Sequence, residues 1–119
     1  MRDFHKLKVW ERAHRLTLKV YLATQGFPRE ELYGLTTQMR RSSASIPTNI
    51  AEGCGRNSKA ETIQFLNIAR GSLSELEYQL ILAHDLHYLD ANSYFELPSE
   101  RVEMRRMLYA FIQRLKTDI

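Results

Sequence analysis

The sequence predicts an all-α protein, an antiparallel up-down-up-down four-helix bundle formed by a single domain of residues 1–119. Apolar residues recur at spacings of three and four through four segments, which is the pattern of amphipathic helices. Strand signals, which require alternating apolar and polar residues, are nearly absent. Proline, glycine and asparagine mark short connections between the segments, and helices joined in this way pack most economically as antiparallel neighbours.

The first helix is expected over residues 7–24, where Trp10 and Val20 belong to one apolar stripe. It is expected to stop at Gly26, because glycine suits the C-cap of a helix. Pro28, two residues later, cannot continue a helix and strengthens this boundary.

The second helix is expected from near Arg29 to Gly53, with Pro47 in its interior. Proline has no N–H to give to the carbonyl of Ser43, and its ring presses against that carbonyl, so we expect a kink. The serines at positions 42, 43 and 45 are expected to satisfy the freed backbone groups.

The third helix has the clearest start, because Ser58 and Glu61 have the spacing of a capping box, in which each side chain bonds the other residue's amide. It is expected to reach about His87. Two apolar stripes predict that it lies centrally or faces another subunit. Gly71 costs about 1 kcal/mol relative to alanine, so we expect a neighbouring backbone to pass close there. The stripes are Ile63, Leu66, Ala69, Leu73, Leu76, Leu80 and Ala83, and Phe65, Ile68, Ser72, Leu82 and Leu86.

The fourth helix is expected after the Asp90-Ala91-Asn92 connection. Pro98 is its weak point, because an interior proline removes a backbone hydrogen bond and obstructs the preceding turn. We therefore expect one turn at 92–97 and a main helix from residue 98. The apolar face consists of Leu97, Met104, Leu108, Phe111, Ile112 and Leu115.

The charges are unevenly distributed, although the composition is that of an ordinary globular protein. Residues 1–59 hold eleven Lys and Arg against five Asp and Glu, and residues 60–119 hold six against nine. The halves therefore carry +6 and −3. A mixed, solvated surface explains such charges, and the net charge of +3 does not indicate nucleic acid, but the asymmetry adds modest support for a nucleic-acid partner. No apolar run approaches the ~20 residues of a membrane span, and the N-terminus lacks the apolar region of a signal peptide. A cytoplasmic protein without membrane contact is expected.

No catalytic residue, cofactor or metal site is expected. Di-iron bundles need Glu-x-x-His on two helices, and Glu11 with His14 is the only such pair. His84 and His87 share a helix end and are interpreted as surface histidines. A helical ribonuclease with an arginine four to six residues before a histidine loses its main support, because no histidine here has that spacing. The single cysteine, Cys54, is interpreted as an inert small residue.

Cations in the first half of the chain are candidates for nucleic-acid binding. Four of them are spaced to give the first helix a basic face opposite the Trp10 stripe. Arg56 and Lys59 lie in or next to the loop of residues 53–58, at the start of the third helix, where the free amides and the helix dipole attract anions. A simpler interpretation of this loop is a glycine C-cap, a turn and the N-cap serine Ser58. Arg40 and Arg41 have the alternative of pairing with Glu52 or with acids of the third helix. The candidates are Lys8, Arg12, Arg15, Lys19, Arg40, Arg41, Arg56 and Lys59.

Several short strings of the sequence are more specific than its periodicity. They are FHKLKVW (4–10), YGL (33–35), QMRR (38–41), SIPTNIAEG (45–53) and GSLSELE (71–77). Together they closely resemble the four-helix-bundle family named for proteins encoded in intervening sequences of bacterial 23S rRNA genes. The resemblance covers residues 4 to about 115, and SIPTNIAEG followed by GSLSELE is its most specific part.

The resemblance implies a cytosolic four-helix bundle that assembles as a homopentameric ring and has no enzymatic activity. The family is similar in fold to the accessory protein of diversity-generating retroelements, which binds nucleic acid and a reverse transcriptase. The resemblance also implies that Arg40, Arg41, Asn49 and Glu52 form a polar network at the kink of the second helix.

The sequence thus predicts a non-enzymatic oligomer that binds nucleic acid or acts as a scaffold, with structured RNA favoured over DNA. In a ring each cation is repeated around the axis, which enlarges the positive field. No RNA-recognition motif is present, so binding is expected to be directed at the backbone. The alternative is an adaptor that binds only a protein partner.

Overall fold

The computed structural model describes residues 2–117, apart from the side chains of residues 95 and 98. Within these residues the regular structure is entirely helical, which confirms the predicted all-α class. Short 3₁₀ turns precede two of the α-helices. The elements are η1 (Phe4–Lys6), α1 (Lys8–Thr24), η2 (Arg29–Glu31), α2 (Leu35–Cys54), α3 (Lys59–Asp85) and α4 (Ala91–Thr117).

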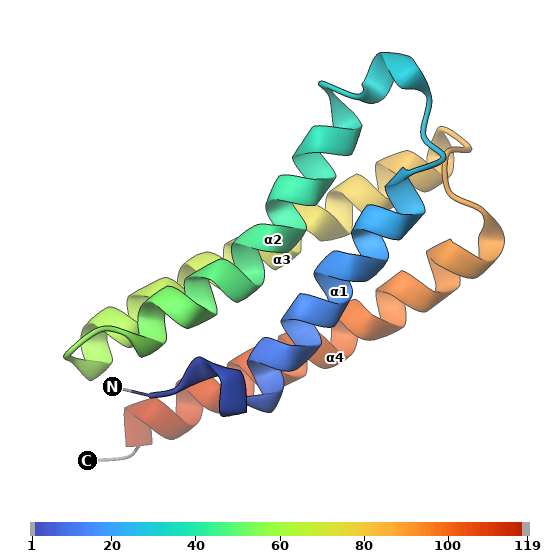
Figure 1. Cartoon of the computed structure of the whole chain (residues 1–119). Helices are drawn as coiled ribbons and strands as arrows, with labels where there is room; N and C mark the ends of the chain where they lie inside the picture. Colours follow the sequence, from blue (N-terminus) through green and yellow to red (C-terminus); the bar gives the residue numbers. More distant parts are fainter. Residues whose placement is uncertain (1, 118–119) are drawn as a thin grey trace.

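The four helices pack as a bundle in an elongated body of 48 × 24 × 21 Å. α1 and α3 each pack against both α2 and α4. Figure 1 shows that the start of α1, the α2–α3 connection and the end of α4 lie at the same end of the bundle. Segments that are far apart in the sequence therefore meet at this end.

A single buried core runs along the inside of the bundle. On α3, six side chains at spacings of three and four, from Leu66 to Ala83, are at most 2% exposed. They belong to the first predicted stripe of this helix, which is therefore confirmed as its core face. The other helices contribute the buried side chains Val9, Ala13, Leu16, Val20, Leu35, Met39, Ile46, Ile50, Leu97, Met104, Leu108, Phe111, Ile112 and Leu115.

The last turn of α1 is closed by a side chain from α2 and not by a glycine. The helix ends at Thr24 as predicted, but its C-cap is Gln25 in a right-handed conformation, so the predicted cap at Gly26 is wrong. Arg40 of α2 donates to the Thr24 hydroxyl at 2.9 Å and to a backbone carbonyl of the same turn at 3.3 Å. These donors come from another helix, so no left-handed cap is required.

α2 begins at Leu35, six residues later than expected, because residues 29–31 form a separate 3₁₀ turn. Glu31 caps the helix, since its Oε1 accepts the backbone N–H of Leu35 at 3.2 Å. A Cβ at Gly34 would lie only 2.8 Å from this oxygen, so glycine makes room for the cap. The other carboxylate oxygen accepts the Tyr88 hydroxyl at 3.0 Å. Glu31 thereby ties the start of α2 to the α3–α4 connection.

Pro47 lies inside α2 and removes the N–H that would bond the Ser43 carbonyl. That carbonyl accepts the hydroxyl of Thr17, a buried residue of α1, at 2.9 Å. The prediction that serines of α2 would do this is wrong, since Ser43 itself donates to the Arg40 carbonyl at 3.0 Å. Figure 1 shows that the axis of α2 changes direction partway along the helix, as expected for an interior proline.

α3 has the predicted start and a slightly earlier end. Ser58 Oγ accepts the backbone N–H of Glu61 at 3.2 Å, which confirms the serine half of the capping box. The helix ends at Asp85 and the chain turns at His87, whose φ is 64°. A positive φ cannot continue a right-handed helix, so the predicted end near residue 87 is two residues too late.

The close approach expected at Gly71 is wrong for the isolated chain, because a Cβ at this position would have no other atom within 4 Å. Close packing occurs instead at Gly53, near the end of α2. A Cβ there would lie 3.2 Å from both the Thr62 carbonyl oxygen and the Phe65 Cβ of α3. Gly53 therefore lets the two helices approach beside their connection.

α4 is one helix through residue 98, so the predicted division at Pro98 is wrong. The Asp90 carboxylate accepts the backbone N–H of Ser93 at 2.7 Å and supports the start of the helix. Leu97 and Met104, on either side of the proline, are 2% and 1% exposed. Burying each of them contributes about 1.5–3 kcal/mol, which together offsets the ~3 kcal/mol cost of an interior proline.

Candidate nucleic-acid interface

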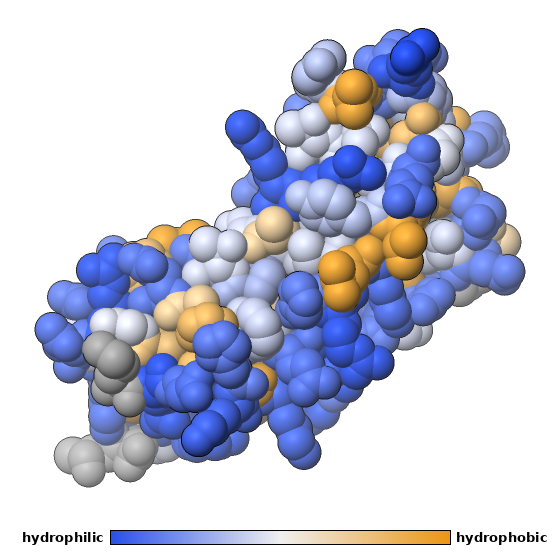
Figure 2. Space-filling model, in the orientation of Figure 1, coloured by the Kyte–Doolittle hydropathy of each residue, from blue (hydrophilic) through white to orange (hydrophobic). Residues whose placement is uncertain are grey.

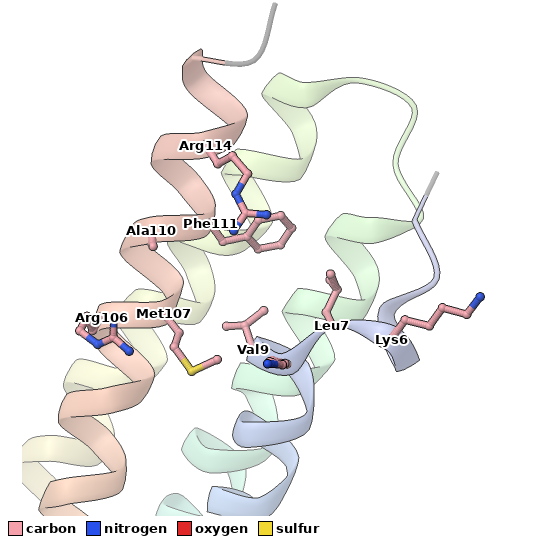
Figure 3. Close-up of a pocket in the computed structure, with 9 residues that line it drawn as sticks. Lys6, Leu7, Val9, Arg106, Met107, Ala110, Phe111 and Arg114 are labelled. Atoms are coloured by element: carbon pink, nitrogen blue, oxygen red, sulfur yellow. The ribbon is translucent and has the colours of Figure 1, made fainter.

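A cleft of about 310 Å³ opens between the start of α1 and the C-terminal half of α4. Val9 and Phe111 are buried at this cleft, and Leu7 and Met107 are half-buried beside them. Figure 3 shows these apolar side chains between the two helices and the guanidinium of Arg114 beside the Phe111 ring. The cationic residues that line the cleft are Lys6, Lys8, Arg106 and Arg114.

The turn η1 fixes the chain that carries the two lysines. The Asp3 carboxylate accepts the backbone N–H of His5 at 3.1 Å, and the N–H of Leu7 returns to the Phe4 carbonyl at 3.0 Å. The rings of Phe4 and Trp10 pack edge to face with centroids 5.1 Å apart. The segment before α1 is therefore held against the bundle at the mouth of the cleft.

Most of the positive charge at this cleft is not neutralised. Arg106 pairs with Glu103 on its own helix at 2.5 Å. Within residues 2–117, Lys6, Lys8 and Arg114 have no carboxylate within ion-pairing distance. These three charges remain available to an anionic ligand.

A second cleft, of about 110 Å³, lies where the α2–α3 connection meets the end of α4 and is lined by Arg2, Arg56 and Lys59 among others. Arg2 links the two clefts, because its guanidinium lies 5.6 Å from the centroid of the Phe111 ring. Arg56 pairs with Glu52 at 2.7 Å, whereas Arg2 and Lys59 form no ion pair in the described part of the chain. We refer to the unpaired cations of both clefts as the basic end; they are Arg2, Lys6, Lys8, Lys59 and Arg114.

Two features beside the basic end are structural. The side chain of Ser58 satisfies an amide at the start of α3, as the more economical interpretation of that loop predicts. Cys54 is buried, and burial raises the pKa of its thiol. A protonated buried thiol is a poor nucleophile, in agreement with the interpretation of Cys54 as an inert residue.

The predicted basic face of α1 is only partly free, because acids of α4 pack against it. Lys19 Nζ lies 2.8 Å from Glu96 Oε1 and 2.9 Å from Glu100 Oε1. Arg12 lies 3.6 Å from the second oxygen of Glu100. The hydrogen bond to Glu96, followed by that to Glu100, raises the pKa of Lys19. Arg12 and Lys19 therefore connect α1 to α4.

This cluster makes stability dependent on pH. Burial acts to raise the pKa of Glu100, but the hydrogen bond from Lys19 and the nearby cationic charges outweigh it, so this pKa lies below its ordinary value of 4.5. The stabilisation that Glu100 contributes is therefore present above the pKa of this residue in the unfolded chain. It is lost as the pH falls through the lower pKa of the folded protein. We expect Glu100→Gln to lose less stability than the wild type between about pH 6 and pH 3 in urea unfolding. The control is Glu75→Gln, which removes an exposed carboxylate without an ion pair; its stability should depend on pH as that of the wild type does. Identical pH dependence of stability in all three proteins would contradict the role assigned to Glu100.

The remaining predicted cations lie apart from the basic end. Arg15 is exposed on α1, and Arg40 is committed to the last turn of that helix. Arg41 is exposed at a groove between α2 and α3. Asn49 donates to the Ser45 carbonyl at 2.7 Å, so the side chains expected to form one polar network bond different neighbours.

Arg2, Lys6 and Arg114 belong to the basic end but are not among the cations predicted from the sequence. The available signals were the basic N-terminus and the cations in the last turn of α4. Nothing in the spacing of the residues shows that positions more than 100 residues apart share one surface. The fold brings them together because α1 begins where α4 ends.

The histidines of residues 2–117 are not arranged as metal ligands. Among these residues no group of three or more His, Cys, Asp and Glu side chains is placed to hold a metal ion. His14 stacks on Trp10 with ring centroids 5.3 Å apart, and His84 stacks on Tyr94 at 3.9 Å. No helix within residues 2–117 is long and apolar enough to cross a membrane.

Comparisons with known proteins agree with this fold. Residues 5–110 match the family described as 23S rRNA-intervening sequence protein. A crystal structure of a protein of unknown function from the S23 ribosomal protein family of Bacteroides thetaiotaomicron is 25% identical, with a TM-score of 0.78. The similarity covers 87% of this chain and 97% of that chain. No curated protein matches the sequence.

Proposed function

Because the chain belongs to the 23S rRNA-intervening sequence protein family, we propose that it is a non-enzymatic, cytoplasmic RNA-binding module whose contact surface is the basic end. The observation that carries this proposal is the gathering of five cations without ion pairs around two adjoining clefts. Unpaired cations attract phosphates and release the counterions of the nucleic acid, which is the main source of sequence-independent affinity.

The form of the surface favours contacts with the RNA backbone. Phe111, the aromatic residue of the larger cleft, is only 5% exposed, so its ring has no free face on which a base can stack. Lys6, Lys8 and Arg114 are exposed at the rim, where long side chains can reach phosphates. The family name and the ribosomal name of the structural neighbour support RNA as the nucleic acid.

We expect the double substitution Lys8→Ala with Arg114→Ala to weaken binding of a fluorescent structured RNA about tenfold at low salt. The slope of log affinity against log salt should become shallower by about two, since two phosphate contacts are lost. Fluorescence anisotropy over a salt series measures both quantities. The control is Arg12→Ala with Lys19→Ala, which removes the same charge from cations that are paired within the fold.

Equal weakening by both double substitutions would show that overall charge, and not the basic end, determines affinity. No binding by the wild type even at low salt would contradict the proposal and favour the adaptor function.

We also propose that the protein acts as an oligomer, most economically the pentameric ring implied by the family resemblance. Several large apolar side chains on α1, on α3 and at the C-cap of α3 are more than two-fifths exposed, and large exposed apolar patches mark interaction surfaces. Figure 2 shows hydrophobic side chains gathered over the middle of α1. The exposed residues are Leu18, Tyr21, Leu22, Ile68, Tyr78, Ile81 and Leu86.

A further inference from the structure

A polar groove of about 360 Å³ lies between α2 and α3, apart from the two clefts of the basic end. Its size is in the range of small-ligand sites. No apolar side chain is among the residues that line it, which is unusual for a space between two packed helices. The lining residues are Gln38, Arg41, Ser42, Ser45, Ser72, Glu75 and Gln79.

Gln79 is the most informative of these residues. It is 8% exposed, and its Oε1 is buried without a hydrogen-bond partner among the described residues. Its Nε2 forms no hydrogen bond within residues 2–117 either. Leaving such a buried group unpaired destabilises the fold, so a ligand that bonds this amide gains more than it would at an exposed site.

A chain of hydrogen bonds joins two hydroxyls of the groove. Asn49 Nδ2 donates to Ser45 Oγ at 2.9 Å, and Ser45 Oγ lies 2.8 Å from Ser72 Oγ. Either serine can donate in this contact, so the pair can offer a ligand a hydroxyl donor or an acceptor. Ser72 is 6% exposed, so its hydroxyl lies deep in the groove, where a hydrogen bond is stronger than in water.

The rim carries one cation and one anion. Arg41 and Glu75 are both exposed, and neither forms an ion pair with any described residue. The groove therefore has no net charge and offers a planar pair of donors from a guanidinium together with two acceptors from a carboxylate. A neutral ligand with two acceptors on one edge and two donors on another would satisfy both groups.

We propose that this groove binds an unpaired guanine base of the RNA ligand; the inference rests on the proposed function and specifies what that RNA presents. Guanine offers O6 and N7 to the fork of Arg41. Its N1–H and N2–H₂ groups, on the adjacent Watson–Crick edge, match the two oxygens of Glu75. Adenine lacks an acceptor at position 6, and the pyrimidines have no N7, so only guanine satisfies both side chains. Single-stranded bases are commonly recognised on these two edges.

The test is a titration of the ¹⁵N-labelled full chain with guanosine monophosphate, followed by the backbone and side-chain amide signals. We expect the Gln38 and Gln79 side-chain amides to shift. Adenosine and uridine monophosphates should bind at least about tenfold more weakly, because adenine and uracil can form neither of the two bidentate contacts. Inosine monophosphate, which lacks the N2 amino group, should also bind more weakly than the guanosine nucleotide.

Two variants separate recognition from structure. Glu75→Gln should weaken guanosine monophosphate about tenfold but weaken inosine monophosphate less, since inosine has one donor fewer to lose. Gln79→Met should raise Tm, because it replaces an unpaired buried amide. The control is Glu61→Gln, an exposed carboxylate on α3 outside the groove.

Equal shifts with all four nucleotides, or shifts confined to the basic end, would overturn the guanine site. If the guanine site fails in this way but RNA still binds with a salt dependence that Lys8 and Arg114 determine, the proposed RNA-binding function stands without a guanine site. If guanosine monophosphate binds in the groove but RNA does not bind, the groove is a nucleotide site and the proposed function fails.

Discussion

Replacing Thr17 with valine is expected to lower the free energy of unfolding by about 1–3 kcal/mol. Valine keeps the shape of the side chain but removes the hydroxyl that bonds the Ser43 carbonyl at 2.9 Å. No amide of α2 can take over this bond, because Pro47 stands four residues after Ser43. Urea unfolding measures the change, and Thr48→Val, at an exposed position of α2, should change stability by no more than about 0.5 kcal/mol.

The same substitution should cost much less in a Pro47→Ala background. Alanine restores the N–H at position 47, which can bond the Ser43 carbonyl within the helix. The two substitutions are therefore expected to be non-additive by about 1 kcal/mol or more in a double-mutant cycle. An equal cost of Thr17→Val in both backgrounds would contradict the role assigned to the threonine hydroxyl.

Gly53→Ala is expected to destabilise the protein by about 1–3 kcal/mol, the usual cost of forcing an extra methyl group into packed structure. The added Cβ would lie 3.2 Å from the Thr62 carbonyl oxygen and 3.2 Å from the Phe65 Cβ. The helices cannot simply separate, because the Thr62 hydroxyl donates to the Gly53 carbonyl at 2.8 Å. Thermal or urea unfolding measures the loss.

Gly71→Ala is the matched control and is expected to have the opposite sign. The site is open, so alanine should stabilise α3 by about 1 kcal/mol through its helix propensity. Destabilisation by this variant in the monomer would contradict the structure at Gly71.

Sedimentation equilibrium of the same variant tests the proposed oligomer, since a lower association constant would place Gly71 against a second copy. A wild type that sediments only at 14.0 kDa would refute the oligomer.

The candidate interface could be predicted only in part. Lys8 is predicted from the basic face of the first helix, and Lys59 from its place at the start of the third helix. The spacing of Arg12 and Lys19 correctly places them on one side of α1, but spacing does not show what packs against that side. The acids of α4 that pair with them lie more than 70 residues away in the sequence. Whether a cation is free or paired is therefore a property of the fold.

The sequence by itself determined the helical class, the core face of α3 and the serine cap at its start, because these follow from periodicity and from contacts within a few residues. The tertiary structure decided how each irregular position is accommodated. Pro47 is compensated by Thr17 of another helix, and the start of α2 is set by Glu31 with Gly34. It also decided which cations share the end of the bundle, since bonds between distant segments exist only after the helices have packed. Local patterns specify each helix, but the environment of its polar groups depends on its neighbours.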